Sequence, residues 1–404
     1  MSLSPKQIEY LKNCNHRWNI KVGATGSGKS WLDYAVVIPQ RMLAAHKEGA
    51  NVLLGNTQGT IIRNIIEPMR EIWGEHLVSA LHSDNTVDLF GKSAYVLGAD
   101  SRKHVARIQG MTIEYAYGDE MTTWDESVFQ MLKSRLRCKH SVFDGTCNPD
   151  NPTHFLKQFI DSDFDIYCQT SVIDDNPFLP PEFVANLKQE YEGTVYYDRF
   201  ILGKWTRAEG IIYDMFDRKK HVVASADRPY TVYYISMDYG TLNPTAMLLW
   251  GKFDGKWYQV DEYYYSGRDS NRQKTDEEYY SELVNLIGSR SIRAVIIDPS
   301  AASMIACIKR HGKFTVIPAD NAVQDGIRDT ATELNAGRLL ICDRCKNTIA
   351  EYEAYSWDGK ASAKGEDKPI KENDHAMDAT RYFIHTIVKR PKAKVANRYM
   401  LGIY

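Results

Sequence analysis

The sequence predicts an α/β fold of two domains, the first built on a mainly parallel sheet and the second on a mixed sheet. In the first half, β-branched and apolar runs alternate with amphipathic stretches, which is typical of parallel strands joined by helices. In the second half, several strand-like runs follow one another across short turns before helices return, which indicates antiparallel neighbours within a mixed sheet. Between the two halves the alternation of strand-like and helix-like segments is interrupted. We therefore expect domains at residues 1–205 and 229–404 and a junction at 206–228.

The composition is that of an ordinary water-soluble globular chain. A length of 404 residues suits two or three domains, and 43% hydrophobic and 25% charged residues are average values. No apolar run approaches the roughly 20 residues that a membrane span needs, and the N-terminus lacks the apolar stretch of a secretory signal. We therefore expect a cytoplasmic protein without membrane contact, whose seven scattered cysteines stay reduced.

The first strand, at residues 18–22, is followed by a glycine-rich loop and by a helix that runs from Lys29 to about residue 45. The loop matches the pattern G-x-x-x-x-G-K-[ST] in full, in the strand-to-helix context that gives this pattern its meaning. Its backbone N–H groups and the helix N-terminus would bind phosphate, Lys29 would reach the terminal phosphates, and a serine would ligate Mg²⁺. A flexible glycine-rich turn is the alternative. The candidate nucleotide contacts are Gly23, Thr25, Gly26, Ser27, Gly28, Lys29 and Ser30.

Strands at 51–56, 112–120 and 140–146, with helices at 59–73 and 124–137, supply the rest of the first domain. A serine of a phosphate loop holds Mg²⁺ with the help of an acid at the tip of a neighbouring strand, and Asp119 in "AYGDE" is placed for that task. Glu120 follows directly and would polarise the water that attacks the γ-phosphate of ATP. A surface turn is the alternative interpretation of this acidic pair.

Three further polar residues fit a nucleotide site. Thr146 and Asn148 in "DGTCNP" end another strand, where they would sense the γ-phosphate or the attacking water, and a plain turn is the alternative. Gln7 lies on an N-terminal helix that Ser4 caps and Pro5 begins. Its amide can pair with the edge of adenine.

In the second half, strands are expected at 230–240, 245–251 and 256–267, then a helix at 275–288 and a strand at 292–297. Asp238 and Asp298 end two of these strands, and Asp378 lies on a late helix at 372–388. Burying such carboxylates is expensive unless a cation is present. Two strand aspartates and one helix aspartate suit a site for two Mg²⁺ or Mn²⁺ ions, in which one ion activates water and the other stabilises the leaving 3′ oxygen of a phosphodiester.

Other residues of this half are weaker candidates. His375 lies three residues before Asp378 and faces the same way, so it is expected as an outer ligand or proton donor, with a surface histidine as the alternative. Glu262 is a fourth candidate ligand, although a hairpin surface residue is the favoured interpretation. Cys342 and Cys345 form a single C-x-x-C without a second pair, which favours a structural role over a metal or redox site.

The order of these motifs resembles that of the large terminase subunit of tailed double-stranded DNA phages and prophages. The resemblance covers about residues 1–390 and includes "YGDE", "GTCNP", the junction "RFILGKWTRAEGIIYDMF", "MDYGTLNPTA", "IIDPS" and "DHAMDATRY". It implies an N-terminal P-loop ATPase domain of the ASCE type that pumps DNA into a procapsid. It also implies a C-terminal RNase H-like nuclease domain that cuts concatemeric DNA.

The resemblance also implies roles and partners. Asp119 would be the Mg²⁺ acid, Glu120 the catalytic carboxylate of the ATPase, and Asp238, Asp298 and Asp378 the nuclease metal ligands. A phosphoryl-stabilising arginine is needed, and Arg107 is favoured over Arg102 because it precedes Gly110 and the strand that carries Asp119. The implied partners are double-stranded DNA, a small terminase subunit and the portal protein. During packaging in the host bacterial cytoplasm, the chain is expected to form a homo-oligomeric ring, taken to be a pentamer. A monomer in solution is the alternative.

Two other functions fit parts of the pattern. A DNA repair or recombination ATPase joined to a nuclease would need helicase motifs, and no second RecA-like lobe is recognisable. An ATP-gated assembly scaffold without nuclease activity would have lost its metal site, whereas all three aspartates are present. Net charge is −2, but "KSRLRCKH" at 133–140 and the basic tail after Asp378 offer contacts to DNA phosphates, with solvated surface as the alternative.

Overall fold

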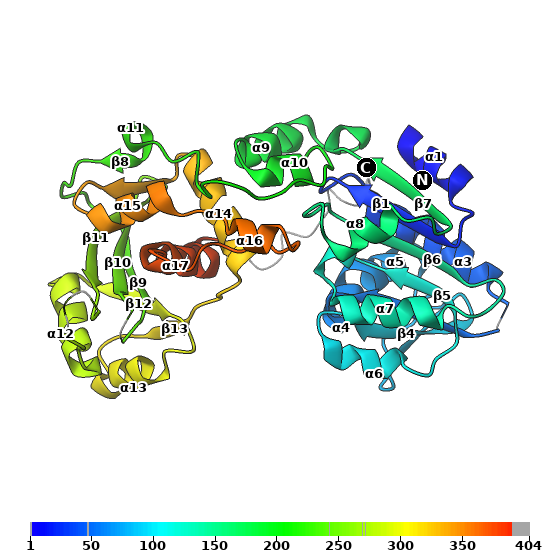
Figure 1. The fold of residues 1–404 in the computed structure, drawn as a ribbon, viewed down its shortest axis with the longest axis horizontal. Coiled ribbons are helices and arrows are strands. Elements are labelled where there is room, and N and C mark those ends of the chain that lie inside the picture. The colour runs from blue at the N-terminus through cyan, green and yellow to red at the C-terminus, as the bar shows by residue number, and fades with distance from the viewer. Residues whose placement is uncertain (1, 47, 242, 269, 271, 390–404) are drawn as a thin grey trace. The chain divides into compact units, whose positions relative to one another are not determined.

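The computed structural model describes residues 2–46, 48–241, 243–268, 270 and 272–389 (Figure 1). The chain forms two compact units. Among the described residues, unit 1 contains those up to Ala185 together with Tyr197–Arg207, and unit 2 contains Asn186–Tyr196 and residues 208–389. No helix of the described chain is long and apolar enough to cross a membrane.

Unit 1 is built on a seven-stranded sheet in the order β3-β4-β2-β5-β6-β1-β7. Every neighbouring pair is parallel except β3 and β4, which form a hairpin at one edge. The predicted parallel sheet and its predicted strands are therefore confirmed. The strands are β1 Trp18–Gly23, β2 Ala50–Gly55, β3 Thr86–Leu89, β4 Lys92–Gly98, β5 Ile113–Gly118, β6 Val142–Cys147 and β7 Ile166–Ser171.

The central strands of this sheet are buried along their whole length. They are buried because helices cover both faces of the sheet. One face packs on a cluster that includes Ile20, Val52 and Phe129, and the other on a cluster that includes Ile38, Leu53 and Ile65. The helices are α1 Pro5–Asn13, α2 Lys29–Leu32, α3 Ile38–Ala44, α4 Gln58–Ile61, α5 Glu67–Trp73, α6 Val105–Ile108, α7 Glu126–Arg135 and α8 Phe155–Ile160. Two later helices, α9 Pro181–Tyr191 and α10 Val195–Phe200, each contain residues of both units.

Two predicted helices of unit 1 contain a proline and continue through it by the same device. The π turn Asp33–Val37 joins α2 to α3, with the Ile38 N–H bonded to the Asp33 carbonyl directly before Pro39. The π turn Ile62–Ile66 joins α4 to α5 in the same way before Pro68. A proline inside a helix lacks the N–H donor of a regular turn, and its ring clashes with the carbonyl of the residue four positions earlier. The wider π turn accommodates both the missing hydrogen bond and the ring. The predicted helix from Lys29 to about residue 45 is thus a single helical run with a local bulge.

Unit 2 is built on a second seven-stranded sheet in the order β13-β12-β9-β10-β11-β14-β8. Strand β10 is antiparallel to both of its neighbours, β9 and β11, and the remaining pairs are parallel. The predicted mixed sheet is confirmed. The strands are β8 Val222–Val223, β9 Val232–Asp238, β10 Thr245–Phe253, β11 Lys256–Tyr265, β12 Ile292–Ile297, β13 Val316–Pro318 and β14 Leu339–Cys342.

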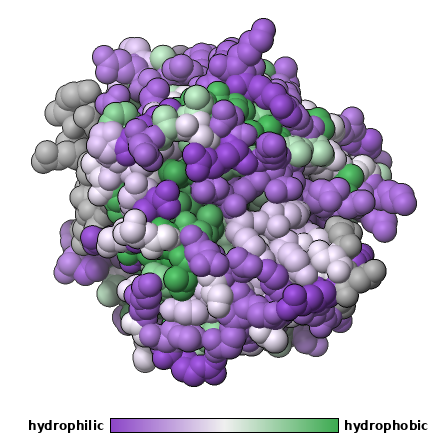
Figure 2. Space-filling model, turned by 90° about the vertical axis from the view of Figure 1, so that its left-hand side faces the viewer, coloured by the Kyte–Doolittle hydropathy of each residue, from purple (hydrophilic) through white to green (hydrophobic). Residues whose placement is uncertain are grey.

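The two faces of this sheet carry different helices (Figure 1). On one face, Ile235 and Met237 of β9 pack with side chains of α12 and α13. On the other, the Phe383 ring of α17 stacks on Trp250 at 4.6 Å between centroids. The helices are α11 Arg218–His221, α12 Asp276–Ile287, α13 Ala302–His311, α14 Val323–Asn335, α15 Lys346–Ala354, α16 Gly359–Ser362 and α17 His375–Phe383, which the π turn Ile384–Val388 extends. The side of unit 2 that carries α12 presents mainly hydrophilic side chains, with smaller hydrophobic areas between them (Figure 2).

The packing of α14 on α17 depends on a glycine. A Cβ atom at Gly326 of α14 would lie 2.0 Å from Cγ of Arg381. Gly326→Ala is expected to destabilise the protein by about 1–3 kcal/mol through overpacking, although alanine is the better helix former by about 1 kcal/mol. Urea unfolding would measure this change. Gly359→Ala is the matched control, because a Cβ there meets no atom within 4 Å, and an equal loss in both variants would contradict the packing argument.

Candidate functional site

Three neighbouring parallel strands of unit 1 end at the same edge of the sheet, in the order β5-β6-β1. Residues 23–30, called the phosphate loop below, follow β1, Asp119 follows β5, and Thr146 and Asn148 lie at the end of β6. Because the carboxyl ends of parallel strands form a common edge, residues that are far apart in the sequence meet there. This edge is the candidate site of unit 1.

The backbone of the phosphate loop has the form that its glycines predict. A Cβ atom at Gly23 would lie 2.2 Å from the carbonyl oxygen of Ser171, so only glycine fits beside the end of β7. Gly28 is left-handed, with φ of 82°, and caps the helical run that Lys29 begins. Within the described residues, the N–H groups of Gly28, Lys29 and Ser30 have no acceptor. Such a row of unpaired donors at a helix N-terminus favours an anionic ligand.

The Lys29 ammonium lies over the loop. Its Nζ donates hydrogen bonds to the carbonyls of Gly23, at 2.8 Å, and Ala24, at 2.7 Å, and to Oδ1 of Asn148, at 3.1 Å. Burial lowers the pKa of Lys29 to about 8. The predicted phosphate-binding lysine and the predicted polar residue after β6 are therefore in direct contact.

Asp119 is buried at the centre of this edge. Its Oδ1 accepts hydrogen bonds from Thr146 Oγ1 at 2.9 Å and from Ser30 Oγ at 3.4 Å. Its Oδ2 accepts from Asn64 at 3.5 Å, a contact that the sequence analysis missed. Burial raises the pKa of Asp119, and these donors oppose that rise. Serine and aspartate oxygens at this separation are the ligand type that Mg²⁺ prefers.

Glu120 is exposed beside the buried Asp119 and has φ of 51°. A side chain other than glycine in the left-handed region costs on the order of 1 kcal/mol, and such strain is common at functional positions. The Glu120 carbonyl accepts a hydrogen bond from the Thr123 N–H at 2.9 Å, which closes the turn. The backbone thus changes direction sharply between a buried and an exposed carboxylate.

Two other predicted residues of unit 1 have different surroundings. Both ends of the Gln7 amide are engaged within the protein, since Oε1 accepts from the Ser4 N–H at 2.9 Å and Nε2 donates to the Gly28 carbonyl at 3.2 Å. Gln7 therefore contacts the phosphate loop, and its pairing with adenine stays a prediction. Arg107 is exposed on α6, and no hydrogen bond joins it to the phosphate loop within the described chain.

A buried ion pair lies directly behind the loop and was not foreseen from the sequence. Lys21 of β1 projects to the face opposite Ile20 and forms an ion pair with Asp33, with Nζ 2.7 Å from Oδ1. The same ammonium lies 3.8 Å from the centroid of the Tyr10 ring. Burial raises the pKa of Asp33 to about 7. The pair joins the strand that enters the loop to the helical run that leaves it.

In unit 2, the alternation of β9 brings the predicted carboxylates to one side. Tyr234, Ser236 and Asp238 share a face, and Tyr234 packs on Phe383 of α17 with 5.8 Å between ring centroids. Asp238 therefore meets the start of α17, where its Oδ2 lies 2.8 Å from Nδ1 of His375. Burial raises the pKa of Asp238, and Asp238 in turn raises the pKa of His375 against the effect of burial.

Asp298 follows the neighbouring strand β12 on the same face. Its Oδ2 accepts hydrogen bonds from Asn321 at 2.9 Å and from the Tyr382 hydroxyl at 3.3 Å. Burial alone would raise the pKa of Asp298, but these donors and Ser300 hold it below its usual range. Burial, reinforced by the charges of Asp238, Asp378 and Asp298, raises the pKa of Tyr382. Of the three predicted aspartates, Asp298 is the one that the Tyr382 hydroxyl contacts, and the sequence did not point to this tyrosine.

Asp378 is paired with two cations. Its Oδ2 lies 3.0 Å from Nζ of Lys371, and its Oδ1 accepts from Arg381 at 2.9 Å. Arg381 and Tyr382 follow Asp378 by three and four residues, a helical spacing that could have identified them. Lys371 precedes the helix, and its contact depends on how the preceding loop folds.

The weaker candidates of unit 2 have other surroundings. Glu262 accepts hydrogen bonds from the N–H groups of Asn347, at 2.7 Å, and Thr348, at 3.0 Å, so it caps the N-terminus of α15 and is not a free hairpin residue. Cys342 and Cys345 are buried free thiols. Of the basic residues in the tail, Arg381 pairs with Asp378 and Lys389 with Glu333, and Arg390, Lys392, Lys394 and Arg398 lie outside the described residues.

The fold and the loop geometry define a phosphate-loop α/β protein with an appended mixed-sheet unit. Residues 21–220 match the family described as terminase large subunit, T4likevirus-type, N-terminal. A large terminase from a thermophilic bacteriophage is 38% identical over 96% of this chain and 100% of its own, with a TM-score of 0.88. The chain belongs to the phage large terminase subunit family.

The same thermophilic phage protein is also known with nucleotides. Its structure in complex with ADP matches with 37% identity and a TM-score of 0.87, and its structure in complex with ATP-gamma-S with 37% identity and a TM-score of 0.86. Each match covers 96% of this chain and 100% of the phage chain. No curated protein matches.

The Lys21–Asp33 pair should be costly to break on one side only. Lys21→Met would leave a carboxylate buried without its cation and is expected to lower the free energy of unfolding by about 3–5 kcal/mol. Asp33→Leu should be similarly destabilising, whereas the double variant should recover much of the loss. Urea unfolding of the four proteins measures the coupling. Additive losses would contradict the pairing.

Proposed function

We propose that this large terminase subunit hydrolyses ATP to translocate double-stranded viral DNA into a procapsid and cuts the concatemeric DNA with a metal-dependent nuclease site. The observation that carries the ATPase half is the contact of Lys29 with Asn148, and of Ser30 and Thr146 with Asp119, at the ends of three adjacent strands. The ADP and ATP-gamma-S complexes of the thermophilic phage terminase support the same assignment.

In this proposal each residue of unit 1 has a definite task. The phosphate loop amides and Lys29 bind the β- and γ-phosphates of ATP, and Ser30 and Asp119 hold Mg²⁺, which neutralises charge on the phosphates. Glu120 orients the attacking water, and Thr146 and Asn148 respond to the γ-phosphate. Gln7 holds the loop and faces adenine, and Arg107 stabilises the transferring phosphoryl group.

Hydrolysis would change the contacts of Lys29. In the described structure its ammonium bonds to loop carbonyls and to Asn148. A γ-phosphate would compete for the same donor, so ATP binding and phosphate release would shift Lys29 between two sets of acceptors and move the end of β6 with it. This is a local two-state element of the kind that can drive translocation.

In unit 2 we propose an RNase H-like nuclease domain. Its order β11-β10-β9-β12-β13, with three antiparallel strands followed by two parallel ones, supports that assignment. Asp238, Asp298 and Asp378 would hold two Mg²⁺ or Mn²⁺ ions, which activate water and stabilise the leaving oxygen. Their oxygen donors suit these ions. The three carboxylates do not all lie within 4.8 Å of one another.

The charged neighbours of these aspartates have supporting tasks in the same proposal. His375 bonds to Asp238 and would carry a proton near the leaving group. Arg381 orients Asp378 from a buried position, whereas the half-exposed Lys371 can release it. The domain limits predicted from the sequence, 1–205 and 229–404, remain our proposal for the two activities.

The proposed partners follow from the family. They are double-stranded DNA, a small terminase subunit and the portal of the procapsid, with the large subunit acting as a pentameric ring in the host bacterial cytoplasm. The DNA grip is expected to be electrostatic and therefore salt-sensitive. No specific observation favours a repair ATPase or an assembly scaffold without nuclease activity.

Separate substitutions should separate the two activities. Lys29→Ala removes the phosphate-binding ammonium and is expected to abolish ATP hydrolysis and DNA packaging, while cutting of plasmid DNA in Mn²⁺ persists. Asp298→Ala is expected to lose plasmid cutting and keep ATP hydrolysis. Phosphate release and gel assays measure the two rates on the same preparations. Simultaneous loss of both activities in a folded Lys29→Ala protein would refute the two-site proposal.

Nucleotide affinity should fall as the pH rises above about 8. In the free protein burial lowers the pKa of Lys29 to about 8, and bound phosphates favour the charged ammonium, so binding takes up a proton at higher pH. The dissociation constant is expected to rise by up to about tenfold per pH unit above that value. Calorimetry with ADP at pH 7 and 9, in buffers of different ionisation enthalpy, measures both effects. Lys29→Arg is the control, since its charge does not titrate, and a wild-type affinity independent of pH would contradict the argument.

A further inference from the structure

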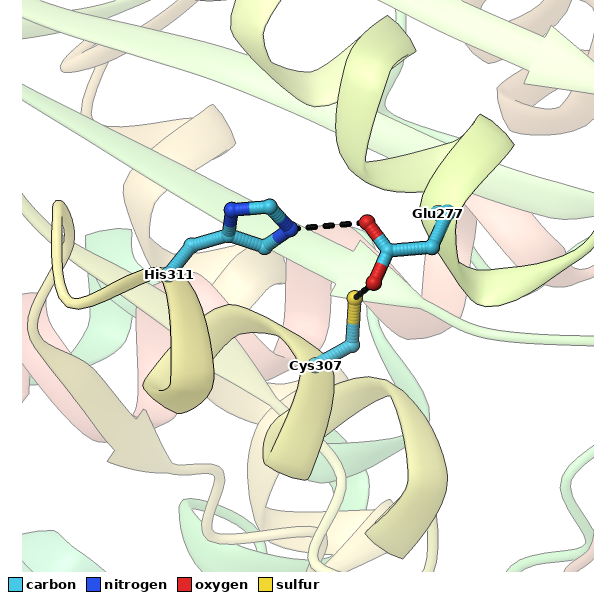
Figure 3. Close-up of side chains that lie close together, drawn as sticks. All are labelled: Glu277, Cys307 and His311. Carbon is cyan, nitrogen blue, oxygen red and sulfur yellow. Dashed lines mark hydrogen bonds and ion pairs between the residues drawn. The ribbon is translucent and has the colours of Figure 1, made fainter.

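A second group of metal-ligand side chains lies in unit 2, between α12 and α13. Glu277 is in the first turn of α12, and Cys307 and His311 are one turn apart on α13. Figure 3 shows the three side chains pointing toward one another. One ligand atom from each lies within 4.8 Å of the other two, which holds for no other group of three such residues in the described chain.

The distances suit a transition metal. The Cys307 Sγ lies 3.5 Å from the Glu277 Oε1, and the His311 Nε2 lies 2.7 Å from the Glu277 Oε2. Ligands on a tetrahedral zinc ion, with bonds of about 2.0–2.3 Å, are separated by about 3.3–3.8 Å. The sulfur and oxygen are already at that separation, and the imidazole and carboxylate need to part by less than about 1 Å.

The surroundings hold the ligands in place. The His311 ring stacks on Tyr280 of α12 with 3.8 Å between centroids and 5° between planes, which fixes its direction. Cys307 is 2% exposed and packed in the core of the unit. Two of the three ligands are therefore positioned without a metal, which lowers the cost of binding one.

The arrangement does not suit nucleophilic catalysis. A reactive thiol needs surroundings that favour the thiolate. Here burial and the Glu277 carboxylate raise the pKa of Cys307, and the opposing charge of the nearby Arg310 does not offset them. A bound cation, in contrast, would favour the thiolate and draw all three groups together.

One side chain competes with a metal. The Arg310 guanidinium contacts the Glu277 carboxylate and lies 3.9 Å from the Cys307 sulfur. Its side chain is 67% exposed, so it can leave for solvent at little cost. Arg310 would therefore oppose a second positive charge between these side chains.

We propose that Glu277, Cys307 and His311 form a binding site for Zn²⁺ or a similar thiophilic cation, with solvent in the fourth position. Cysteine and histidine ligands select such ions over Mg²⁺, so this site differs in kind from the aspartate sites of both units. A bound ion would fasten α12 to α13. The neighbouring Asp276 accepts a hydrogen bond from the Tyr239 hydroxyl, and Tyr239 directly follows Asp238. The proposed metal site therefore lies close to the proposed nuclease site, but it does not depend on that site.

The test is a titration of the full chain with Co²⁺ after chelation, followed by competition with Zn²⁺. One equivalent of Co²⁺ is expected to give a thiolate-to-cobalt charge-transfer band that Zn²⁺ removes. Cobalt held by carboxylates alone gives no such band. Cys307→Ser should lose the band, and His311→Gln and Glu277→Gln should weaken binding at least about tenfold. Arg310→Gln should tighten it.

The controls keep the outcome decisive. Cys14→Ser replaces a thiol of unit 1 and should leave the band unchanged, and far-ultraviolet circular dichroism verifies that each variant is folded. Absence of the band in the wild-type chain, its persistence in Cys307→Ser, or equal binding by His311→Gln would overturn the proposal. If these side chains form only ion pairs between the two helices, Arg310→Gln should lower the free energy of unfolding, and no thiolate-to-cobalt band should appear in any of the proteins.

Discussion

Charged groups that are buried beside apolar strands have to be paired, and both units are organised around this requirement. In unit 1 the central strands are buried on both faces, so Lys21 can lie in β1 only because Asp33 meets it from the helical run after the loop. The same face holds Asp144, which bonds to Arg41 at 2.8 Å. These pairs fix how the helical run lies on the sheet and thereby where the phosphate loop begins and ends.

In unit 2 the same requirement acts on the aspartates of the candidate metal site. Asp378 is buried on α17, and the Arg381 side chain reaches it through the space that Gly326 leaves open on α14. Asp238 is balanced by His375, and Asp298 by neutral donors. The protein thus holds these carboxylates with partial compensation, and divalent cations would join them there.

The candidate site residues could be selected from the sequence, because each stands at a place that local pattern defines. The phosphate loop lies between a strand and a helix, and Asp119, Asp238 and Asp298 end apolar runs. Their partners were not foreseeable. Tyr382, Lys371 and Asn64 reach these sites from helices or loops whose placement depends on packing. Glu262, for which a hairpin surface residue was the favoured interpretation, caps the N-terminus of α15.

The α/β class, the two sheets, the glycine-rich loop and the candidate acids follow from the sequence, because they depend on hydrophobic period and on short-range patterns. Tertiary structure alone decided which charges meet. Cys307 and His311 share a helix face by their spacing, but Glu277 joins them only because α12 packs on α13. Contacts between distant segments depend on the summed burial of many side chains, which no short stretch of sequence contains.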